Sequence, residues 1–481
     1  MSLPVARLKN GLTLPRVLTG LWQIADMERN GTKVDVDSLA EEIKNYADAG
    51  LTAFDMADHY GSAEEVCGAY RRKYEAPAQF FTKWVPEPGP ITQATTRAAV
   101  DKARKRMNTD TIDLLQFHAW TYADPSWLDA LLYLQELKQE GLIRHIGVTN
   151  FDTAHLRVAL FSGIEITTNQ VCFSLLDQRA AGAMTKLCLE TGVRLLAFGT
   201  LAGGFLSERW LHQPEPVLND LLTWSQMKYK RFIDASGGWA SYQQVLAGLH
   251  QLAQEKKVSI ANLATRFQAE QPAVAAIIIG ARLGQSSHVQ ETKQLFDFDW
   301  TEQDQQTIQL LLKNLQSIPG DCGDEYRKPP FLTASGDLSH HIRSFPSPYP
   351  VRKENDRELA LSGTVWEDLA GFSRAVRKGN HISISGTTAT HGQRVIGGQD
   401  PAAQTHFAID KLEGALQSLG SKLEDVVRTR IFVRNINDWE PVARAHGERF
   451  ANIQPANTLV RADLVGDEYL VEIEADALVS A

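Results

Sequence analysis

Ionisable side chains stand directly after three apolar stretches of the sequence, where each stretch gives way to a turn. Asp55 and Tyr60 follow the first stretch, Lys83 closes the second, and His118 closes the third. A carboxylate, a phenol, an ammonium and an imidazole can transfer protons when a fold brings them together. These four residues are therefore the first candidates for a catalytic site. Whether their side chains lie close together depends on the arrangement of the elements that carry them.

The sequence around these residues alternates between two patterns from about residue 17 to 295. Short β-branched runs, typical of buried strands, alternate with longer amphipathic stretches, typical of helices that cover a sheet. Turn signals such as Gly50 and Gly141 follow the helical stretches. The predicted strands are 17–22, 51–55, 79–83, 112–117, 144–148, 166–171, 193–198 and 275–279, and the predicted helices include 37–49, 94–107, 126–140 and 179–190.

Repeated strand-helix units over this length predict an α/β fold in which a parallel sheet closes into a (β/α)8 TIM barrel. Catalytic side chains of such a barrel lie at the carboxyl ends of the strands, where Asp55, Lys83 and His118 stand. An open, doubly wound sheet is the alternative. The first strand-to-helix turn, residues 20–23, lacks the G-x-G-x-x-G pattern, so a Rossmann cofactor site is unsupported.

The length and charge of the chain limit the classes of function. With 481 residues the chain exceeds the size at which one hydrophobic core usually stops growing, so at least two domains are expected. A formal net charge of -9 argues against a nucleic-acid or anionic-membrane partner, because such surfaces need a cationic excess.

Targeting signals and cysteines indicate the compartment. No basic, apolar leader opens the sequence and no stretch is apolar enough to span a bilayer, so we expect a cytoplasmic protein that is not bound to a membrane. Cys67, Cys172, Cys188 and Cys322 are scattered without a C-x-x-C pair, which predicts reduced thiols and neither a disulfide framework nor a metal site.

The alternating pattern ends near residue 318. Residues 319–360 are rich in Pro, Gly, Ser, His and charged residues, which predicts a linker or an extended arm. Regular patterns return in the last part of the chain, as strands 381–385, 426–433 and 469–475 and helices 401–419 and 439–450. We therefore expect a barrel over 1–318 and a smaller α+β domain over 361–481.

The catalytic candidates closely resemble the signature of the aldo-keto reductase family. In that family Asp, Tyr, Lys and His cluster around the carbonyl group of the substrate, and consecutive strand ends carry them in the order found here. The resemblance implies that Asp55, Tyr60, Lys83 and His118 form this tetrad. It also implies an enzyme that reduces an aldehyde or ketone to an alcohol with a nicotinamide cofactor.

Elementary chemistry agrees with these implied roles. Hydride attack on a carbonyl makes an alkoxide, which needs a proton donor and a local positive field. A phenol titrates near ~10, so Tyr60 needs a neighbouring ammonium to become an efficient acid at neutral pH. Lys83 fits that need, with Asp55 keeping it charged. His118 would orient the carbonyl or assist the proton relay.

Further segments resemble the cofactor site of the family. Residues 147–151 and 168–170 look like the G-V-S-N-F and N-Q segments that hold the nicotinamide carboxamide. Arg282, at the expected start of the last barrel helix, would favour a ribose 2′-phosphate and therefore NADPH. His288 and Thr292 stand where the family more often has Arg and Asn, so NADH is also allowed. The expected cofactor-binding residues are Gly20, Leu21, Trp22, Asp55, Thr149, Asn150, Gln170, Phe198, Gly199, Leu201, Gly203, Gly280, Arg282, Ser286, His288 and Glu291.

Three tryptophans stand beside or after the catalytic candidates. Trp22, Trp84 and Trp120 would line an apolar or aromatic pocket for a small-molecule carbonyl substrate, with core packing as the alternative for each. A second hypothesis for the whole chain is a NADPH-binding redox sensor or scaffold in which turnover is incidental. The presence of both Tyr60 and His118 favours the enzyme, since a sensor needs neither.

Four segments of the last part of the chain carry a second resemblance: residues 371–380, 384–386, 400–405 and 471–475. From about Gly371 onward the chain resembles the reactive-intermediate deaminase (RidA/YjgF-like) family, which implies a chorismate-mutase-like α+β fold. In that family an Arg after a Pro-Ala pair binds the carboxylate of the substrate, whereas this chain has Asn457 there. Arg461 or Arg374 would have to replace it, with Glu474 as the candidate for activating water.

We therefore expect the second domain to assemble the chain or to bind a ligand rather than to deaminate. Members of the family form trimers, which implies a homo-oligomer with a trimer as the expected form. A third hypothesis joins the two domains. In it the C-terminal part hydrolyses an imine and the barrel reduces the carbonyl product.

Overall fold

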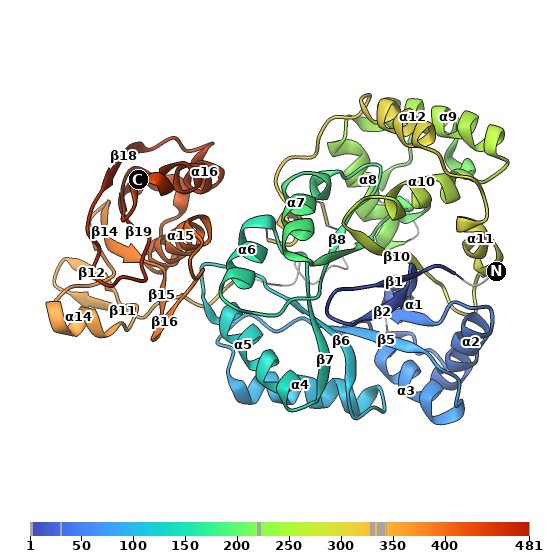
Figure 1. The fold of residues 1–481 in the computed structure, drawn as a ribbon, viewed down its shortest axis with the longest axis horizontal. Helices are drawn as coiled ribbons and strands as arrows, with labels where there is room; N and C mark the ends of the chain where they lie inside the picture. The colour runs from blue at the N-terminus through green and yellow to red at the C-terminus, as the bar shows by residue number, and fades with distance from the viewer. Residues whose placement is uncertain are drawn as a thin grey trace.

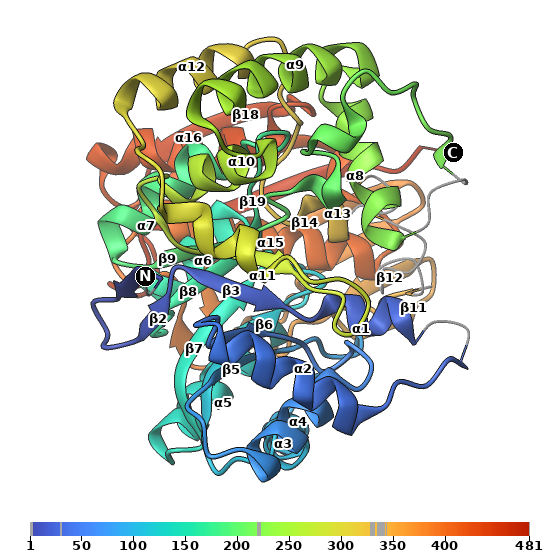
Figure 2. The same cartoon turned by 90° about the vertical axis from the view of Figure 1, so that its right-hand side faces the viewer.

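The computed structural model describes residues 3–28, 31–218, 223–327, 332–333, 342 and 344–480. A large barrel and a smaller second domain lie side by side (Figure 1). Viewed from the barrel end, the second domain lies behind the barrel (Figure 2). None of the helices formed by the described residues combines the length and the apolar character needed to cross a bilayer.

Eight parallel strands close into a barrel, which confirms the predicted (β/α)8 fold. Consecutive strands are neighbours, and the last one closes the ring by pairing with the first and with the seventh. The runs are short and apolar because side chains fill the barrel interior and helices cover the outside. The strands are β3 (Val17–Gly20), β4 (Ala53–Asp55), β5 (Gln79–Trp84), β6 (Ile112–His118), β7 (Ile143–Thr149), β8 (Thr168–Cys172), β9 (Arg194–Phe198) and β10 (Val274–Gly280).

Helices surround the barrel, and side-chain caps fix where several of them begin. Asp35, Asp152 and Ser259 each accept a hydrogen bond from a backbone N–H of the following turn. The predicted helix 179–190 is interrupted at Gly182, so that only its second part is α-helical. The helices are α1 (Trp22–Met27), α2 (Val36–Asp48), α3 (Ala63–Lys73), α4 (Gln93–Arg106), α5 (Ser126–Gln139), α6 (Thr153–Phe161), α7 (Ala183–Thr191), α8 (Trp224–Ala235), α9 (Gly238–Lys256), α10 (Ile260–Ala269), α11 (Val289–Lys293), α12 (Glu302–Leu312) and α13 (Asp324–Arg327).

An N-terminal hairpin closes one end of the barrel. Its strands, β1 (Val5–Arg7) and β2 (Thr13–Pro15), are antiparallel. Leu8, Leu12 and Leu14 form one apolar cluster with side chains of the barrel strands. Because this plug fills the amino-terminal end, the carboxyl ends of the strands form the open mouth of the barrel.

The second domain is an α+β unit, as predicted. Its seven-stranded sheet has the order β11-β12-β13-β14-β19-β17-β18 and is antiparallel except between β17 and β18. Asp400 caps the long helix α15, with Pro401 in the first turn. The elements are β11 (Val351–Glu354), β12 (Arg357–Ala360), α14 (Val365–Ala370), β13 (Ala375–Lys378), β14 (His381–Thr388), β15 (Thr390–His391), β16 (Arg394–Val395), α15 (Pro401–Ser418), β17 (Val426–Val433), α16 (Trp439–Phe450), β18 (Ala456–Arg461) and β19 (Val471–Leu478).

The segment predicted as a linker, 319–360, contains regular structure in its described parts. Strands β11 and β12 form a hairpin that extends the sheet of the second domain, and α13 contacts the barrel mouth. Asn355, in the hairpin turn, has φ 55°, a conformation that Asn tolerates. Strand β11 is mostly exposed and charged, so no apolar alternation marks the hairpin in the sequence.

Helix α15 forms much of the boundary between the two domains. It packs on its own sheet and on helix α6 of the barrel, and Figure 1 shows α15 beside α6. Its residues are buried along almost the whole length, because the sheet covers one side and the barrel the other. Ion pairs between the domains join Arg157 to Asp400, His155 to Asp410 and His391 to Asp129.

Candidate active site

The four catalytic candidates meet at the open mouth of the barrel. Asp55 ends β4, Lys83 lies in β5, His118 ends β6, and Tyr60 follows in the loop after β4. The Lys83 Nζ atom lies 2.6 Å from Asp55 Oδ2 and 5.0 Å from the centre of the Tyr60 ring. Asp55, Lys83 and His118 are buried. Three separate strand ends therefore bring a phenol, an ammonium, a carboxylate and an imidazole into one cluster.

The Lys83 ammonium is held by oxygen atoms of β4 and its loop. It donates to Asp55 Oδ2 and, at 2.9 Å, to the carbonyl oxygen of Met56. Burial lowers the pKa of Lys83, because a low-dielectric surrounding disfavours the charge, and the Asp55 carboxylate opposes this shift. The Asp55 carboxylate thus favours the charged form of Lys83, although both side chains are only 4% exposed.

Two amides hold the other oxygen of the Asp55 carboxylate. Asp55 Oδ1 accepts hydrogen bonds from Gln170 Nε2 at 2.7 Å and from Gln116 Nε2 at 3.3 Å. Gln116 was not among the residues selected from the sequence. It stands two residues before His118 on β6, and this period of two, which puts both on one face of the strand, could have revealed it.

One nitrogen of His118 has no partner in the described part of the chain. Its Nδ1 faces the Thr149 carbonyl oxygen at 3.4 Å, whereas its Nε2 is buried without a hydrogen bond. Burial, and then the positive charge of Arg327, lower the pKa of His118 well below its usual value, so the ring is neutral at pH 7. Since a carbonyl only accepts, this contact puts the proton on Nδ1 and leaves Nε2 as an acceptor.

A cavity of about 760 Å³ contains these four side chains in its lining. A space of this size holds an extended organic ligand rather than a single ion or water molecule. Most of the residues selected from the sequence share it: Gly20, Trp22, Asp55, Tyr60, Lys83, His118, Trp120, Thr149, Asn150, Gln170, Phe198, Gly199, Leu201, Gly203, Gly280, Arg282, Ser286 and His288.

Leu21 and Glu291 do not line the cavity, so their contacts with a cofactor remain predictions. Leu21 is fully buried in the apolar core, because the chain turns into α1 directly after it. Glu291 points to neighbouring protein groups: one carboxylate oxygen accepts from Ser259 Oγ at 2.8 Å and the other lies 3.4 Å from His288 Nδ1.

Arg282 lines the cavity from a loop. The prediction that it stands at the start of the last barrel helix is therefore wrong. The helix that follows, α11, begins only at Val289 and is five residues long. The Arg282 guanidinium crosses to helix α1, where Nη1 donates to Asp26 Oδ2 at 2.9 Å and to Gln23 Oε1 at 3.3 Å. A positive group at this place is therefore supplied by the side chain alone.

Two of the three predicted tryptophans lie at the cavity. Trp22 meets the Tyr60 ring edge-on, with 5.0 Å between centroids, and Trp120 meets His118 edge-on at 4.4 Å. Trp84 is the exception. Its side chain is buried in the core between strands and helices, where it packs against an aromatic ring of β6, so the core-packing alternative holds for this residue.

Comparison with known proteins identifies the barrel. A model described as Aldo/keto reductase family matches residues 16–313. The chain belongs to the aldo/keto reductase family. A second model, described as Endoribonuclease L-PSP, matches residues 366–479. The predicted order of an aldo-keto reductase followed by a RidA/YjgF-like domain is thus confirmed, as is the oxidoreductase class.

Three similar proteins illustrate the two parts. Aldo-keto reductase YhdN of Bacillus subtilis is 25% identical over 66% of this chain and 96% of its own length. The crystal structure of the Bombyx mori aldo-keto reductase in complex with NADP covers 69% of this chain and 100% of its own, with 20% identity and a TM-score of 0.50. A YjgF/YER057c/UK114 family member from Mycobacterium tuberculosis is 42% identical over 26% of this chain and 99% of its own, with a TM-score of 0.24.

The reductase cavity includes residues that sequence reasoning missed. Lys228, on α8, donates to the Tyr326 hydroxyl at 2.6 Å and lies 5.2 Å from the centre of the Phe198 ring. Tyr326, on α13, meets the His118 ring edge-on at 5.7 Å. Neither carried a signal, because α8 lies in the long connection between β9 and α10 and α13 lies in the segment expected to be a linker.

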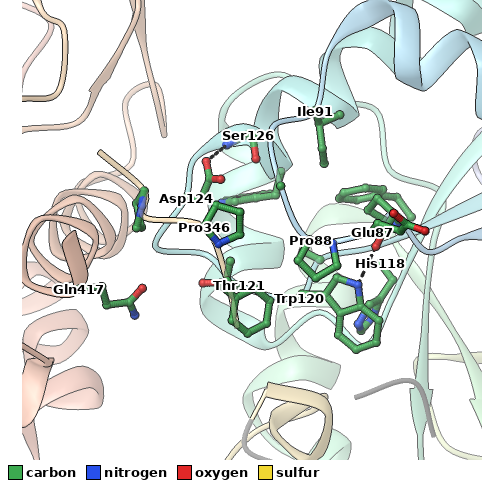
Figure 3. Close-up of a pocket in the computed structure, with 17 residues that line it drawn as sticks. Glu87, Pro88, Ile91, His118, Trp120, Thr121, Asp124, Ser126, Pro346 and Gln417 are labelled. Carbon is green, nitrogen blue, oxygen red and sulfur yellow. Dashed lines mark hydrogen bonds between the residues drawn. The ribbon is translucent and has the colours of Figure 1, made fainter. Parts of the chain in front are cut away.

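A second, small cleft lies beside the reductase cavity, and His118 and Trp120 line both (Figure 3). Trp120 Nε1 donates to the Pro86 carbonyl oxygen at 2.8 Å, which fixes the indole between the two spaces. Pro346, from the segment that joins the domains, and Gln417, from α15, line the far side of the cleft. The wall of the active site therefore adjoins the second domain.

Three of the four candidates in the second domain form contacts with neighbouring strands of its sheet. Asn457 donates to a threonine hydroxyl of β17 at 2.9 Å. Arg374 is buried and donates to the Gly386 carbonyl oxygen at 2.7 Å. Glu474 forms an ion pair with an arginine of β17 at 2.6 Å, and Arg461 is exposed at the end of β18. Neither Arg374 nor Arg461 forms an ion pair with Glu474 among the described residues, and the guanidinium that does so belongs to Arg430.

Proposed function

We propose that the chain reduces an aldehyde or ketone to an alcohol with NADPH. The observation that carries the proposal is the buried Lys83–Asp55 ion pair beside Tyr60, in a cavity that His118 also lines. Reduction of a carbonyl group needs a proton donor next to a fixed positive charge, and this cluster supplies both.

In this proposal Tyr60 donates the proton to the carbonyl oxygen. The Lys83 ammonium, 5.0 Å from the ring centre, stabilises the negative charge that Tyr60 acquires when its proton leaves. Asp55 opposes the loss of charge that burial favours for Lys83, so the cation is in place before the substrate arrives. The two amides on Asp55 fix its direction.

His118 would act through its Nε2 acceptor. A nitrogen that accepts cannot donate to a carbonyl oxygen, but it can accept a hydrogen bond from a hydroxyl group. The contact with Thr149 therefore favours the proton-relay role over polarisation of the carbonyl. Because the ring stays neutral, it adds no positive charge to that of Lys83.

The cavity is suited to a nicotinamide dinucleotide. Asn150 Oδ1 is buried without a hydrogen-bond partner in the described part of the chain, as an acceptor for a carboxamide would be. Arg209, Lys228 and Arg282 line the same cavity and offer positive charge to phosphate groups. The Bombyx mori reductase, with the same fold, was solved with NADP. When bound, NADPH supplies the hydride.

The substrate would bind between aromatic rings. Trp22, Trp120 and Tyr326 line the cavity next to Tyr60 and His118, so apolar and aromatic carbonyl compounds are the preferred class. Such rings bury apolar surface while the Tyr60 hydroxyl stays within the same space.

Replacing Tyr60 tests the proposal. Tyr60→Phe should lower kcat for NADPH-dependent reduction by at least about 100-fold and leave the Kd for NADPH within about twofold, because only the proton is lost. Tyr133→Phe, on the outer helix α5, is the matched control and should behave as wild type. A Tyr60→Phe enzyme with wild-type turnover would contradict the assignment.

The same assay separates the enzyme from the sensor. A redox sensor would bind NADPH tightly and fail to oxidise it with every member of a panel of aromatic and aliphatic aldehydes and ketones. Steady oxidation of NADPH that depends on the carbonyl compound and on Tyr60 supports the reductase.

For the second domain we propose a role in assembling copies of the chain. Strand β18 is the edge of the sheet, most of its residues are exposed, and Val460 is 42% exposed. An uncovered edge strand tends to pair with another chain. Light scattering of the full chain should give the mass of a homo-oligomer, with a trimer expected, and a monomer at micromolar concentration would contradict this role.

A further inference from the structure

A buried histidine joins the two domains through charge. His155, on α6 of the barrel, is 4% exposed, with Nδ1 2.7 Å from Asp152 Oδ1 and Nε2 3.0 Å from Asp410 Oδ1. Asp410 belongs to α15 of the second domain and is 1% exposed. It also accepts a hydrogen bond from Arg449 Nη1 at 2.5 Å. The second domain thus supplies one of the two carboxylates that hold His155.

The His155 ring lies flat against Tyr122 of the barrel mouth. The two ring centroids are 3.4 Å apart and the planes differ by 8°. The Tyr122 hydroxyl accepts a hydrogen bond from Arg327 Nη2 at 2.6 Å, and the guanidinium lies 4.3 Å from the Tyr122 ring centre. Asp410, His155, Tyr122 and Arg327 therefore form one continuous set of contacts, here called the bridging cluster.

The bridging cluster ends at the active site. Arg327 Nη2 also donates to the carbonyl oxygen of Ala119, the residue that follows His118, at 3.0 Å. Arg327 ends α13, so it adjoins Tyr326, whose ring faces His118 in the cavity. The position of Arg327 consequently decides where Tyr326 stands against the substrate space.

The hydrogen bonds of the cluster need the charge on His155. A neutral imidazole donates from only one nitrogen, whereas a protonated one can donate to Asp152 and Asp410 at once. The two carboxylates raise the pKa of His155 to about 9 against the effect of burial. Loss of one carboxylate would leave a buried charge with half its compensation, so the ring would move or lose its proton.

We propose that Asp410 of the second domain, through the bridging cluster, positions the segment that carries Tyr326 and so sets substrate affinity in the reductase barrel. None of the cluster residues touches the reacting groups, and they act as positioning residues. This inference rests on the proposed reductase activity for its kinetic readout. It gives the second domain a part in the site that is independent of deamination and of assembly.

Two other ion pairs at the same interface provide matched controls. Arg157 pairs with Asp400, and His391 pairs with Asp129 at 3.0 Å. Both join the same two domains, but neither contacts Tyr122 or Arg327 in the described part of the chain. A general loosening of the interface would follow from breaking any of the three pairs, whereas the proposal singles out Asp410.

The kinetic test compares Asp410→Asn and His155→Gln with His391→Gln in the full chain. Asp410→Asn and His155→Gln should raise KM for an aromatic aldehyde about three- to tenfold, with the Kd for NADPH unchanged within about twofold. His391→Gln should keep the wild-type KM. Asp410→Glu should recover part of the affinity, because the charge is restored. An Asp410→Asn enzyme with wild-type KM, or equal effects in the control, would overturn the proposal.

A structural readout keeps the inference testable without turnover. Amide hydrogen exchange in residues 319–327 should become faster in Asp410→Asn and stay at the wild-type rate in His391→Gln. If the wild type reduced no carbonyl compound, the proposed function would be wrong. The exchange rates would still show whether Asp410 holds residues 319–327 in place. Unchanged exchange in Asp410→Asn would reject the inference even in an active enzyme.

A double substitution tests whether Asp410 and Arg327 affect KM through the same contacts of the bridging cluster. Arg327→Lys shortens the side chain that contacts Tyr122 and so weakens this contact from the other end of the cluster. If both groups act through one path, the effects of Asp410→Asn and Arg327→Lys on KM should fall short of the product of the single effects. Fully multiplicative effects would mean that Asp410 acts on the site by another route.

Discussion

Among single residues, Arg282 carries the choice of cofactor in the proposed function. Its guanidinium is shared between Asp26 and Gln23 of α1, at 2.9 Å and 3.3 Å. A ribose 2′-phosphate at this place would compete with the Asp26 carboxylate for the same N–H groups. Discrimination between NADPH and NADH should therefore depend on both side chains, in opposite directions.

Arg282→Gln should raise the Kd for NADPH by about 10- to 100-fold and change the Kd for NADH by less than about twofold. Only NADPH has the charged group that Arg282 would bind. Asp26→Asn should lower the Kd for NADPH, since it frees the Arg282 guanidinium from its ion pair. Fluorescence titration of both cofactors gives the Kd values. Lys293→Gln, on the neighbouring helix α11, is the control for a simple change in net charge, and an equal loss for both cofactors in Arg282→Gln would contradict the phosphate assignment.

The sequence was enough to select Asp55, Lys83 and His118 as catalytic candidates, because each stands at the end of an apolar run, and the structure brings the three side chains to one cavity. It failed where side-chain direction decides. Trp84 follows Lys83 directly, and successive side chains of a strand point to opposite faces, so Trp84 lies in the core. It also gave no sign of Lys228, whose place depends on how the long connection between β9 and α10 folds over the barrel.

On the scale of elements, the short segment around α13 completes the mouth of the barrel. The Thr153 backbone N–H donates to Asp321 Oδ2 at 2.8 Å, and Glu325 pairs with Arg179 at 2.9 Å. Gly323 lies so close to the barrel that an added Cβ would stand 2.0 Å from the Asn150 carbonyl oxygen. Its φ of 82° is also unfavourable for other residues.

Gly323→Ala should therefore displace the segment and raise KM for the carbonyl substrate, with a loss of about 1–3 kcal/mol in stability. Gly163→Ala is a close control: its φ is 83°, but nothing lies within 4 Å of the added Cβ. Gly163→Ala should lower the free energy of unfolding by about 1 kcal/mol, from the unfavourable backbone conformation alone, and keep the wild-type KM. Urea unfolding and steady-state kinetics measure both effects, and a wild-type KM in Gly323→Ala would show that the segment does not shape the substrate space.

The barrel strands could be predicted to within a few residues because burial on both faces leaves short, continuous apolar runs. Strand 426–433 of the second domain was predicted with the bounds that the structure has. Helix α13 and strand β11 could not be found this way. Both are short and charged and show no local apolar periodicity. Contacts with the barrel hold α13 in place, and pairing with the next strand, β12, holds β11.

At the scale of the whole molecule, the domain interface is the part that the sequence concealed. His155 and Asp410 are 255 positions apart, and each alone is an unremarkable polar residue on a helix. They meet only because α15 packs on α6, and this packing buries both side chains. The two family resemblances gave the parts and their order, but not the contact that links them.

The docked interface should make stability depend on pH in a defined direction. The groups that face His155 are Asp152 of its own helix cap, Tyr122 and Trp127 of the barrel, Asp410 of α15 and, behind Asp410, Arg449 of α16. Of these groups the two carboxylates, Asp152 and Asp410, raise the folded-state pKa of His155 to about 9, above the ordinary value of 6.5 and against the effect of burial. The stabilisation is therefore complete below about pH 6.5, where folded and unfolded states both hold the proton.

As the pH rises from about 7 to 9, the unfolded chain releases this proton while the folded protein keeps it, so the His155 contribution falls by about 1 kcal/mol per pH unit. Lys411 opposes this trend, because burial lowers its pKa to about 7 and its contribution grows over the same range. The His155 part must therefore be taken as the difference between wild type and His155→Gln. Urea unfolding at pH 6.5 and 9 should show that wild type loses more stability than the variant over this interval. Equal losses would mean that His155 is not held as a cation between the two domains.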